Sequence, residues 1–237
     1  MKNLEDALNF LSQSNQNPSP SPSFSDEVNQ RLIVMGETAQ ANVQMAQESQ
    51  AGEFFNQKLI GLLSAAKAVS NKTQKVFWLR RASDLFGGAM QPFSACKAGC
   101  SHCCNIPITL SEVEANAIGK AIGVRPANLA LNAGFMNSLK QDEQSGIRVG
   151  YDNPCVFLKD GACQIYSERP IVCRTHFNMD ADDLLCRLEG DGNSIPVPMA
   201  NCTSISLVQL TSFEKSKWAD VLDIAIELAE SKPDVDP

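Results

Sequence analysis

The stretch CKAGCSHCC, residues 96–104, places four cysteines within nine positions. It is the part of the sequence that says most about the fold and the site. Cys100 and Cys103 have C-x-x-C spacing, so one turn of backbone can supply two of the four ligands of a tetrahedral metal ion. Adjacent Cys103 and Cys104 are poor disulfide partners, and apolar packing gives no reason to gather four cysteines here. The stretch therefore predicts a metal-binding segment.

All nine cysteines of the chain lie between residues 93 and 204. Cys155 and Cys163 flank the turn signal Asp160-Gly161, which predicts a β-hairpin. A two-residue turn would send the two sulfurs to opposite faces. A three-residue loop over 159–161 would put both on one face, about 7 to 8 Å apart at Cα, and is preferred because it places glycine where positive φ is needed.

The remaining cysteines follow on short predicted helices. Cys173 is expected on a capped helical turn with His176 one turn later on the same side, and Cys186 is expected in a helix over 182–188. Cys202 has no near neighbour and is left spare. The number of metal sites stays open, although eight thiolates suffice for two four-thiolate sites, and so does any ligand role of His102 or His176. The candidate metal ligands are Cys96, Cys100, Cys103, Cys104, Cys155, Cys163, Cys173 and Cys186.

The metal itself is expected to be zinc or the iron of an iron–sulfur cluster, because both accept four cysteines. Two zinc ions on eight thiolates would take the net charge from −7 to about −11. Lys97, Arg169 and Arg174 are the cations expected to compensate this charge.

Composition restricts the other partners. The 237 residues include 20 basic and 27 acidic side chains, a balance that repels a phosphate backbone, so nucleic acid is not expected. No apolar run predicts a membrane span, and the acidic N-terminal residues Glu5 and Asp6 do not resemble an export signal. We therefore expect a cytoplasmic protein whose clustered cysteines remain thiols.

Periodic apolar residues predict helices through most of the rest of the chain. A short helix over 3–12 precedes the Pro/Ser linker, and a helix of roughly 25 residues follows from Ser25, its cap. Two further amphipathic helices end at Gly87-Gly88. A capping box, Ser111 with Glu114, opens a helix to about residue 122, and Gly123 is expected to stop it. Helices are also expected over 125–140 and 207–231.

The predicted fold class is mainly α with a small β-hairpin: a helical scaffold plus a metal-stabilised, cysteine-rich irregular region. The N-terminal helices offer a surface for a protein partner or for self-association. The expected divisions are a helical tail at 1–16, a linker at 17–23, the scaffold at 24–92, the cysteine-cluster domain at 93–204 and a C-terminal helix packed on the scaffold at 205–237.

Three motifs together carry a family resemblance. CKAGCSHCC, PCVFLKDGACQIYSERPIVCR (154–174) and THFNMDADDLLC (175–186) resemble the YkgJ-type cysteine-cluster family, which is described by its CxxCxxCC signature as a zinc- or iron-chelating domain. This chain has three residues, 97–99, between its first two cysteines where the simplest signature has two. The resemblance implies metal binding.

Three functions are compatible with such a metal site. The first is a metal-binding protein whose zinc or iron–sulfur cluster folds the cysteine region. The second is an iron–sulfur-dependent oxidoreductase or methyltransferase-like enzyme, because a similar cysteine cluster occurs in flagellin lysine methylases. The third is a metal trafficking or sensing protein. The sequence contains no dinucleotide fingerprint, nucleophile elbow or P-loop, so it offers no independent catalytic motif.

Overall fold

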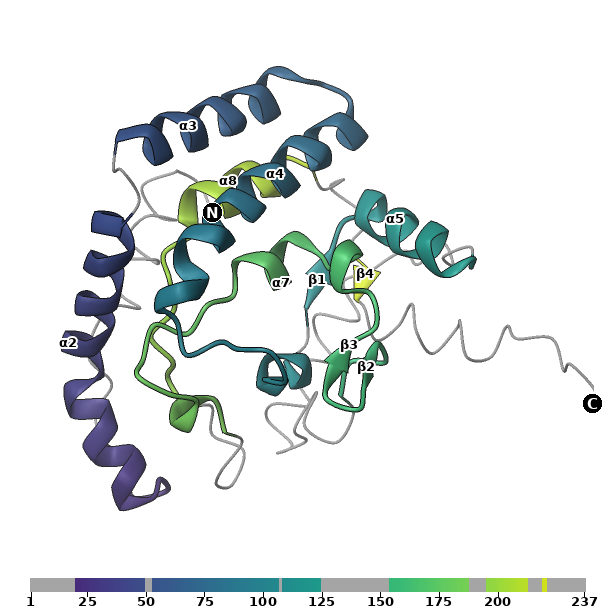
Figure 1. The fold of residues 1–237 in the computed structure, drawn as a ribbon. Coiled ribbons are helices and arrows are strands. Elements are labelled where there is room, and N and C mark those ends of the chain that lie inside the picture. The colour runs from purple at the N-terminus through teal and green to yellow at the C-terminus, as the bar shows by residue number, and fades with distance from the viewer. Residues whose placement is uncertain are drawn as a thin grey trace, which may run out of the picture.

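The computed structural model describes residues 20–49, 53–106, 108–124, 154–187, 195–212 and 219–220. Over these ranges the chain is mainly helical with a small two-stranded antiparallel hairpin, which confirms the predicted mainly α fold with a β-hairpin (Figure 1). The helices predicted over 3–12 and 125–140 lie outside the described residues, as do residues 17–19 of the Pro/Ser linker.

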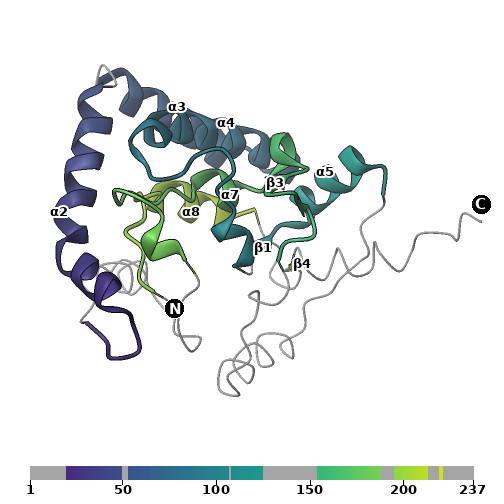
Figure 2. The ribbon, with the colours of Figure 1, turned by 60° about the horizontal axis from the view of Figure 1, so that its bottom comes forward.

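Three long helices form the scaffold: α2 (Asp26–Ser49), α3 (Glu53–Ala68) and α4 (Lys72–Met90). The cap predicted for α2 is present, because the Val28 N–H donates to Ser25 Oγ at 3.3 Å. Asn71 caps α4 in the same way by accepting from the Gln74 N–H. Helix α3 packs along α4, while α2 stands beside them (Figures 1 and 2).

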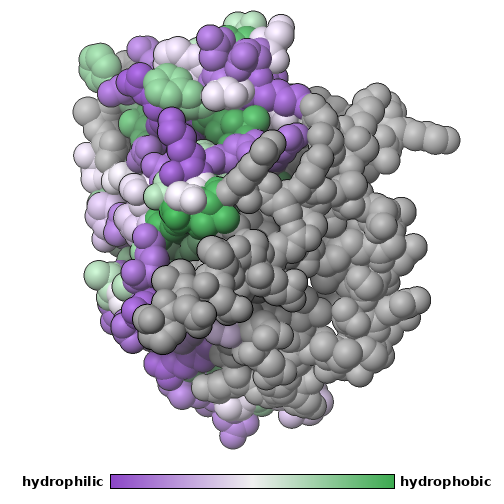
Figure 3. All heavy atoms as spheres, turned by 90° about the vertical axis from the view of Figure 1, so that its right-hand side faces the viewer, coloured by the Kyte–Doolittle hydropathy of each residue, from purple (hydrophilic) through white to green (hydrophobic). Residues whose placement is uncertain are grey.

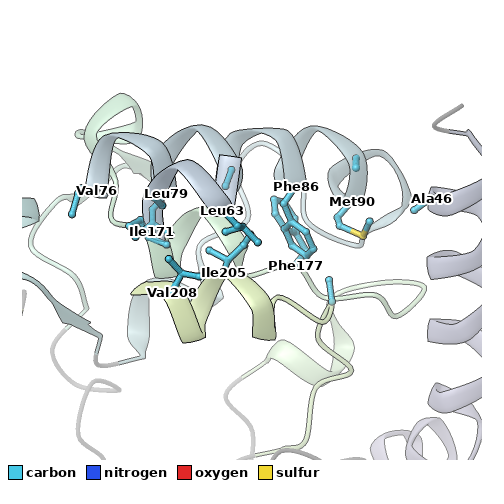
Figure 4. Packing of buried hydrophobic residues seen from close by; sticks show 14 of the residues in the cluster. Ala46, Leu63, Val76, Leu79, Phe86, Met90, Ile171, Phe177, Ile205 and Val208 are labelled. Carbon is cyan, nitrogen blue, oxygen red and sulfur yellow. The ribbon is translucent and has the colours of Figure 1, made fainter. Parts of the chain in front are cut away.

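The main hydrophobic core lies beneath α4. The short helices α7 (Ile171–Thr175) and α8 (Thr203–Leu210) pack against its inner face (Figure 4). Leu79, Ile171 and Ile205 are almost completely buried in this core. Because α7 carries Cys173, this packing fixes one cysteine-bearing element directly on the scaffold.

Gly87 and Gly88 do not end the third helix, contrary to the sequence prediction, because α4 continues through both to Met90. A Cβ atom at Gly87 would lie 3.2 Å from Phe177 Cζ and 3.4 Å from the Arg174 carbonyl oxygen. Glycine is therefore explained at this position by the close approach of the segment that follows α7, and not by a helix stop.

Helix α2 is attached to the segment that carries Cys186. Its buried residues Val28, Leu32 and Met35 pack with Leu184 and Leu185 in a second apolar cluster. Arg31 of the same helix forms ion pairs with Asp180 at 3.0 Å and with Asp182 at 2.9 Å. The residues before Cys186 are thus held by both apolar and charged contacts.

Helix α5 (Glu112–Ile122) forms as predicted, with a complete Ser111–Glu114 capping box and Gly123 as its left-handed C-cap. It follows β1 (Thr109–Leu110), which pairs antiparallel with β4 (Ala219–Asp220). The helix predicted over 207–231 is therefore wrong at residues 219–220, which form a strand. The helix in this region, α8, begins at Thr203 and ends at Leu210, and residues beyond Asp220 lie outside the described part.

Short elements complete the architecture. The hairpin strands are β2 (Leu158–Lys159) and β3 (Ala162–Cys163). Single 3₁₀ turns occupy Gln91–Phe93, His102–Asn105, Tyr166–Glu168 and Leu184–Cys186. Seen from the side, hydrophilic and hydrophobic side chains are interspersed over the coloured atoms of the surface (Figure 3). None of the helices in the described ranges has the length and apolar character needed to cross a membrane.

Candidate metal centre

The first cysteine segment is a pair of tight turns. The Cys100 N–H donates to the Lys97 carbonyl at 3.0 Å, and Gly99 supplies the positive φ of 85° within this turn. The Cys104 N–H then donates to the Ser101 carbonyl at 2.9 Å as the 3₁₀ turn begins. The three residues between the first two cysteines are therefore accommodated by one glycine-dependent turn.

The hairpin differs from the preferred three-residue loop. Leu158 pairs with Cys163 and Lys159 pairs with Ala162, which leaves a two-residue turn of Asp160 and Gly161. Both turn residues have positive φ, 52° and 74°, as a type I′ turn requires. The preference for the longer loop is wrong because Asp160 also adopts the left-handed conformation.

The two hairpin cysteines nevertheless lie close together. The ladder ends where the Gln164 N–H donates to the Phe157 carbonyl at 2.8 Å, and the Leu158 N–H closes a turn onto the Cys155 carbonyl at 2.8 Å. Cys155 therefore stands on a turn before the strand, so the alternation of faces that separates side chains in a strand does not apply to it. The Cys155 N–H also donates to the Cys104 carbonyl at 2.7 Å, which joins the hairpin to the first segment.

Helix α7 brings Cys173 to this group. Burial raises the pKa of Cys173 to about 12, and repulsion from the Cys155, Cys104 and Cys163 thiolates adds to the increase. His176 does not stand one helical turn after Cys173, because α7 ends at Thr175 and His176 has extended backbone angles. Burial lowers the pKa of the His176 imidazole.

Asn178 connects two cysteines that are far apart in sequence. Its backbone N–H donates to Cys96 Sγ at 3.4 Å, and its Nδ2 donates to Cys186 Sγ at 3.3 Å. The segment containing Asn178 is fixed by antiparallel pairing with Met199 and by the Ala95 N–H, which donates to the Asn178 carbonyl at 2.9 Å. Cys186 ends a 3₁₀ turn and not the longer helix predicted over 182–188.

Backbone N–H groups also point at the sulfurs of the hairpin. The N–H groups of Phe157 and Leu158 act on the Cys155 thiol, and the N–H group of Ile165 acts on the Cys163 thiol. These donors lower the thiol pKa, but burial, the larger effect, raises it at both cysteines. N–H donors at a sulfur favour its thiolate form, which is the form that binds metal.

Mutual repulsion opposes ionisation throughout the group. Burial raises the pKa of Cys186 to about 12, and the Cys96 and Cys100 thiolates raise it further. The Cys103 thiol donates to the Cys104 sulfur, which raises the pKa of Cys103 and lowers that of Cys104 to about 7. Several thiolates can therefore coexist here only when a cation compensates their charge.

Of the three cations proposed to compensate the thiolates, Arg169 interacts with them. Its charge lowers the pKa values of Cys96, Cys163 and Cys173, although burial outweighs this effect at each. Arg169 Nε is buried and has no hydrogen-bond partner among the described residues. Arg174 instead pairs with Asp84 at 2.5 Å and donates to the Ser167 and Arg169 carbonyls, so it belongs to the scaffold.

Two further residues join the cysteine segments in contacts that the sequence does not predict. Asp183 Oδ2 lies 3.0 Å from His102 Nε2, which ties the first cysteine segment to the turn that holds Cys186. Glu114 accepts the Ile171 N–H at 2.9 Å and so fixes the start of α7. The capping box identified Glu114, but no local signal in the sequence indicates either long-range contact.

The described residues hold no group of three or more Cys, His, Asp or Glu side chains at the spacing of an assembled metal site. The sulfurs of a tetrahedral zinc site lie about 3.8 Å apart, since each zinc–sulfur bond is about 2.3 Å long. The thiols of this chain are near enough to repel one another as thiolates, but no three of them lie at that spacing in the described residues. Their number, their N–H donors and the orphaned Arg169 Nε all fit a site for a thiophilic cation.

Comparison with known families agrees with this chemistry. Residues 95–189 match the family model "CxxCxxCC: Putative zinc- or iron-chelating domain". This segment is similar to a CxxCxxCC domain. The matched segment, called the CxxCxxCC domain below, includes eight of the nine cysteines and ends before Cys202. Neither the curated proteins nor the solved structures gave a match to the chain.

Proposed function

We propose that this protein chelates zinc, or the iron of an iron–sulfur cluster, through the cysteine thiolates of its CxxCxxCC domain. The observation that carries this proposal is the convergence of thiols from four separate segments. The proposed ligands are Cys96, Cys100, Cys103, Cys104, Cys155, Cys163, Cys173 and Cys186.

The electrostatics of the thiols support a resident cation. A metal ion removes the repulsion that raises the pKa values of Cys173 and Cys186, and it replaces their protons. Burial raises the pKa values of Cys96, Cys155, Cys163 and Cys186, and the N–H donors at these sulfurs partly oppose that increase. When bound, zinc or iron would supply the positive charge that Arg169 alone does not provide.

The metal is proposed to stabilise the cysteine region as well as to occupy it. The hairpin strands are two residues long, and in the described part of the chain their apolar cluster contains five buried residues, among them Leu110 and Phe157. Structural zinc contributes about 10 to 16 kcal/mol in small peptides, far more than such a hairpin can supply. The cysteine-bearing segments would then be held both by their packing on the helical scaffold and by the metal.

Elemental analysis of protein purified with and without oxygen tests the proposal and identifies the metal. A brown protein absorbing near 400 nm, with iron and labile sulfide, indicates an iron–sulfur cluster, whereas a colourless protein containing zinc indicates zinc. A protein that retains neither metal would contradict the proposal.

Cys173→Ser and Cys202→Ser form a matched pair for measuring metal content. Cys173 lies in the cluster, whereas Cys202 lies outside the CxxCxxCC domain, with its Sγ 3.6 Å from Ser206 Oγ. Cys173→Ser should lose metal, and Cys202→Ser should retain the wild-type content. Equal losses from both variants would show that the ligand assignment is wrong.

A further inference from the structure

The eight thiols of the CxxCxxCC domain fall into two sets. Cys96 and Cys186 belong together because Asn178 donates one hydrogen bond to each sulfur, at 3.4 and 3.3 Å. Cys100 joins them, since its thiolate repels those of both Cys96 and Cys186. Cys96 also packs against the main core beneath α4. This set is therefore anchored to the scaffold side of the molecule.

The other set is built around the hairpin. Cys155 and Cys163 both pack against the small apolar cluster that contains Leu110. Cys104 is joined to Cys155 by the 2.7 Å backbone hydrogen bond, and Cys173 is close enough to repel the Cys155, Cys104 and Cys163 thiolates. Four sulfurs thus gather here, which is the full number that a tetrahedral ion accepts.

Cys103 stands between the two sets. It is exposed, and its thiol interacts with Cys104 and Cys173 of the hairpin set and with Cys100 of the Asn178 set. Because the hairpin set already holds four sulfurs, Cys103 is free to complete the Asn178 set. Neighbouring Cys103 and Cys104 would then face different ions.

We propose that the domain holds two separate four-sulfur centres, one formed by Cys96, Cys100, Cys103 and Cys186 and the other by Cys104, Cys155, Cys163 and Cys173. This inference rests on the proposed metal binding and adds the number of centres and the ligands of each. Asn178 is the positioning residue of the first centre, because it orients two of its sulfurs without being a ligand itself.

Arg169 fits between two such centres. Its charge acts on Cys96 of the first set and on Cys163 and Cys173 of the second. An ion held by four thiolates carries a formal charge of about −2 with a divalent metal, so two adjacent centres repel each other. The Arg169 guanidinium, whose buried Nε–H donor has no partner among the described residues, reduces that repulsion and can donate to a thiolate of either centre.

Native mass spectrometry of the full chain loaded with zinc counts the ions directly. Wild type should bind two, and Cys186→Ser and Cys155→Ser should each bind one, whereas the double variant should bind none and Cys202→Ser should keep two. A wild-type chain that binds one zinc, or single variants that each lose both ions, would overturn the two-centre arrangement. A wild-type chain that binds no zinc and no iron would instead overturn the proposed function.

Cadmium-113 NMR of the wild-type chain tests the same assignment without relying on a variant that folds. Two cadmium resonances are expected, with through-bond couplings to the β protons of two non-overlapping sets of four cysteines. A single resonance, or couplings that connect Cys186 and Cys155 to the same ion, would refute the division into two centres.

Discussion

Replacing Glu114 by glutamine should weaken the junction between the scaffold and the cysteine region. The Glu114 side chain is completely buried, and its two oxygens accept three hydrogen bonds. Oε1 accepts the Ile171 N–H at 2.9 Å, while Oε2 accepts the Ser111 N–H at 3.0 Å and the Ser111 hydroxyl at 2.9 Å. One carboxylate thereby caps α5 and fixes the first residue of α7, which carries Cys173.

The size of the effect follows from the geometry of these three bonds. Glutamine has one side-chain oxygen, which can accept from either the Ile171 N–H or the Ser111 N–H. Its NH₂ group, which cannot accept a hydrogen bond, must then face the other N–H. Losing one hydrogen bond to a charged group costs about 2 kcal/mol, and leaving its buried donor unsatisfied costs about 1 kcal/mol more. Glu114→Gln should therefore lower the free energy of unfolding by about 3 kcal/mol.

Urea unfolding followed by far-ultraviolet circular dichroism measures this loss in the metal-loaded chain. Glu37→Gln is the matched control, because Glu37 is exposed on α2 and the substitution makes the same change in net charge. The control should change stability by no more than about 0.5 kcal/mol. Equal midpoints for Glu114→Gln and wild type, or an equal loss in the control, would refute the role given to the Glu114 carboxylate.

Three other predictions concern packing and protons. Gly87→Ala should lower stability by about 1 to 3 kcal/mol, because its Cβ would press on Phe177. Gly88→Ala should not lower stability, because a Cβ atom at Gly88 would meet nothing within 4 Å. Equal thermal midpoints for the two variants would contradict the close contact assigned to Gly87. Zinc binding at pH 7 should release protons from Cys173 and Cys186, whose pKa values of about 12 keep them protonated without metal, and calorimetry in buffers of different ionisation enthalpy would detect the release or its absence. The metal-free chain should lose stability as the pH rises from the ordinary thiol value of 9.0 toward about 12, because the raised pKa values favour the neutral thiols of the folded state; a thermal midpoint constant over that range would contradict this.

Local signals in the sequence were sufficient where local contacts decide the structure. The Ser111–Glu114 capping box, the Gly123 stop and the Ser25 cap all depend on residues within a turn of one another, and each forms as predicted. The hairpin position was also correct. Its turn type was not, because Asp160 and Gly161 can support either loop length and only the paired strands decide between them.

Long-range contacts account for the differences. Glycine at position 87 suggests a helix stop, but Gly87 lies inside α4, where the ring of Phe177 leaves little room for a Cβ atom. Eight cysteines can be recognised as a group from their spacing, yet their division depends on Asn178, which is 82 residues from Cys96. Likewise, Arg169 and Arg174 look equivalent in sequence, and only packing directs one to the sulfurs and the other to Asp84.

X-ray absorption spectroscopy at the metal edge of the anaerobically purified chain tests the central claim most directly. We predict a first coordination shell of four sulfur atoms for each metal ion, at about 2.3 Å if the metal is zinc. A first shell of nitrogen and oxygen atoms alone would contradict the claim that the cysteine thiolates hold the metal.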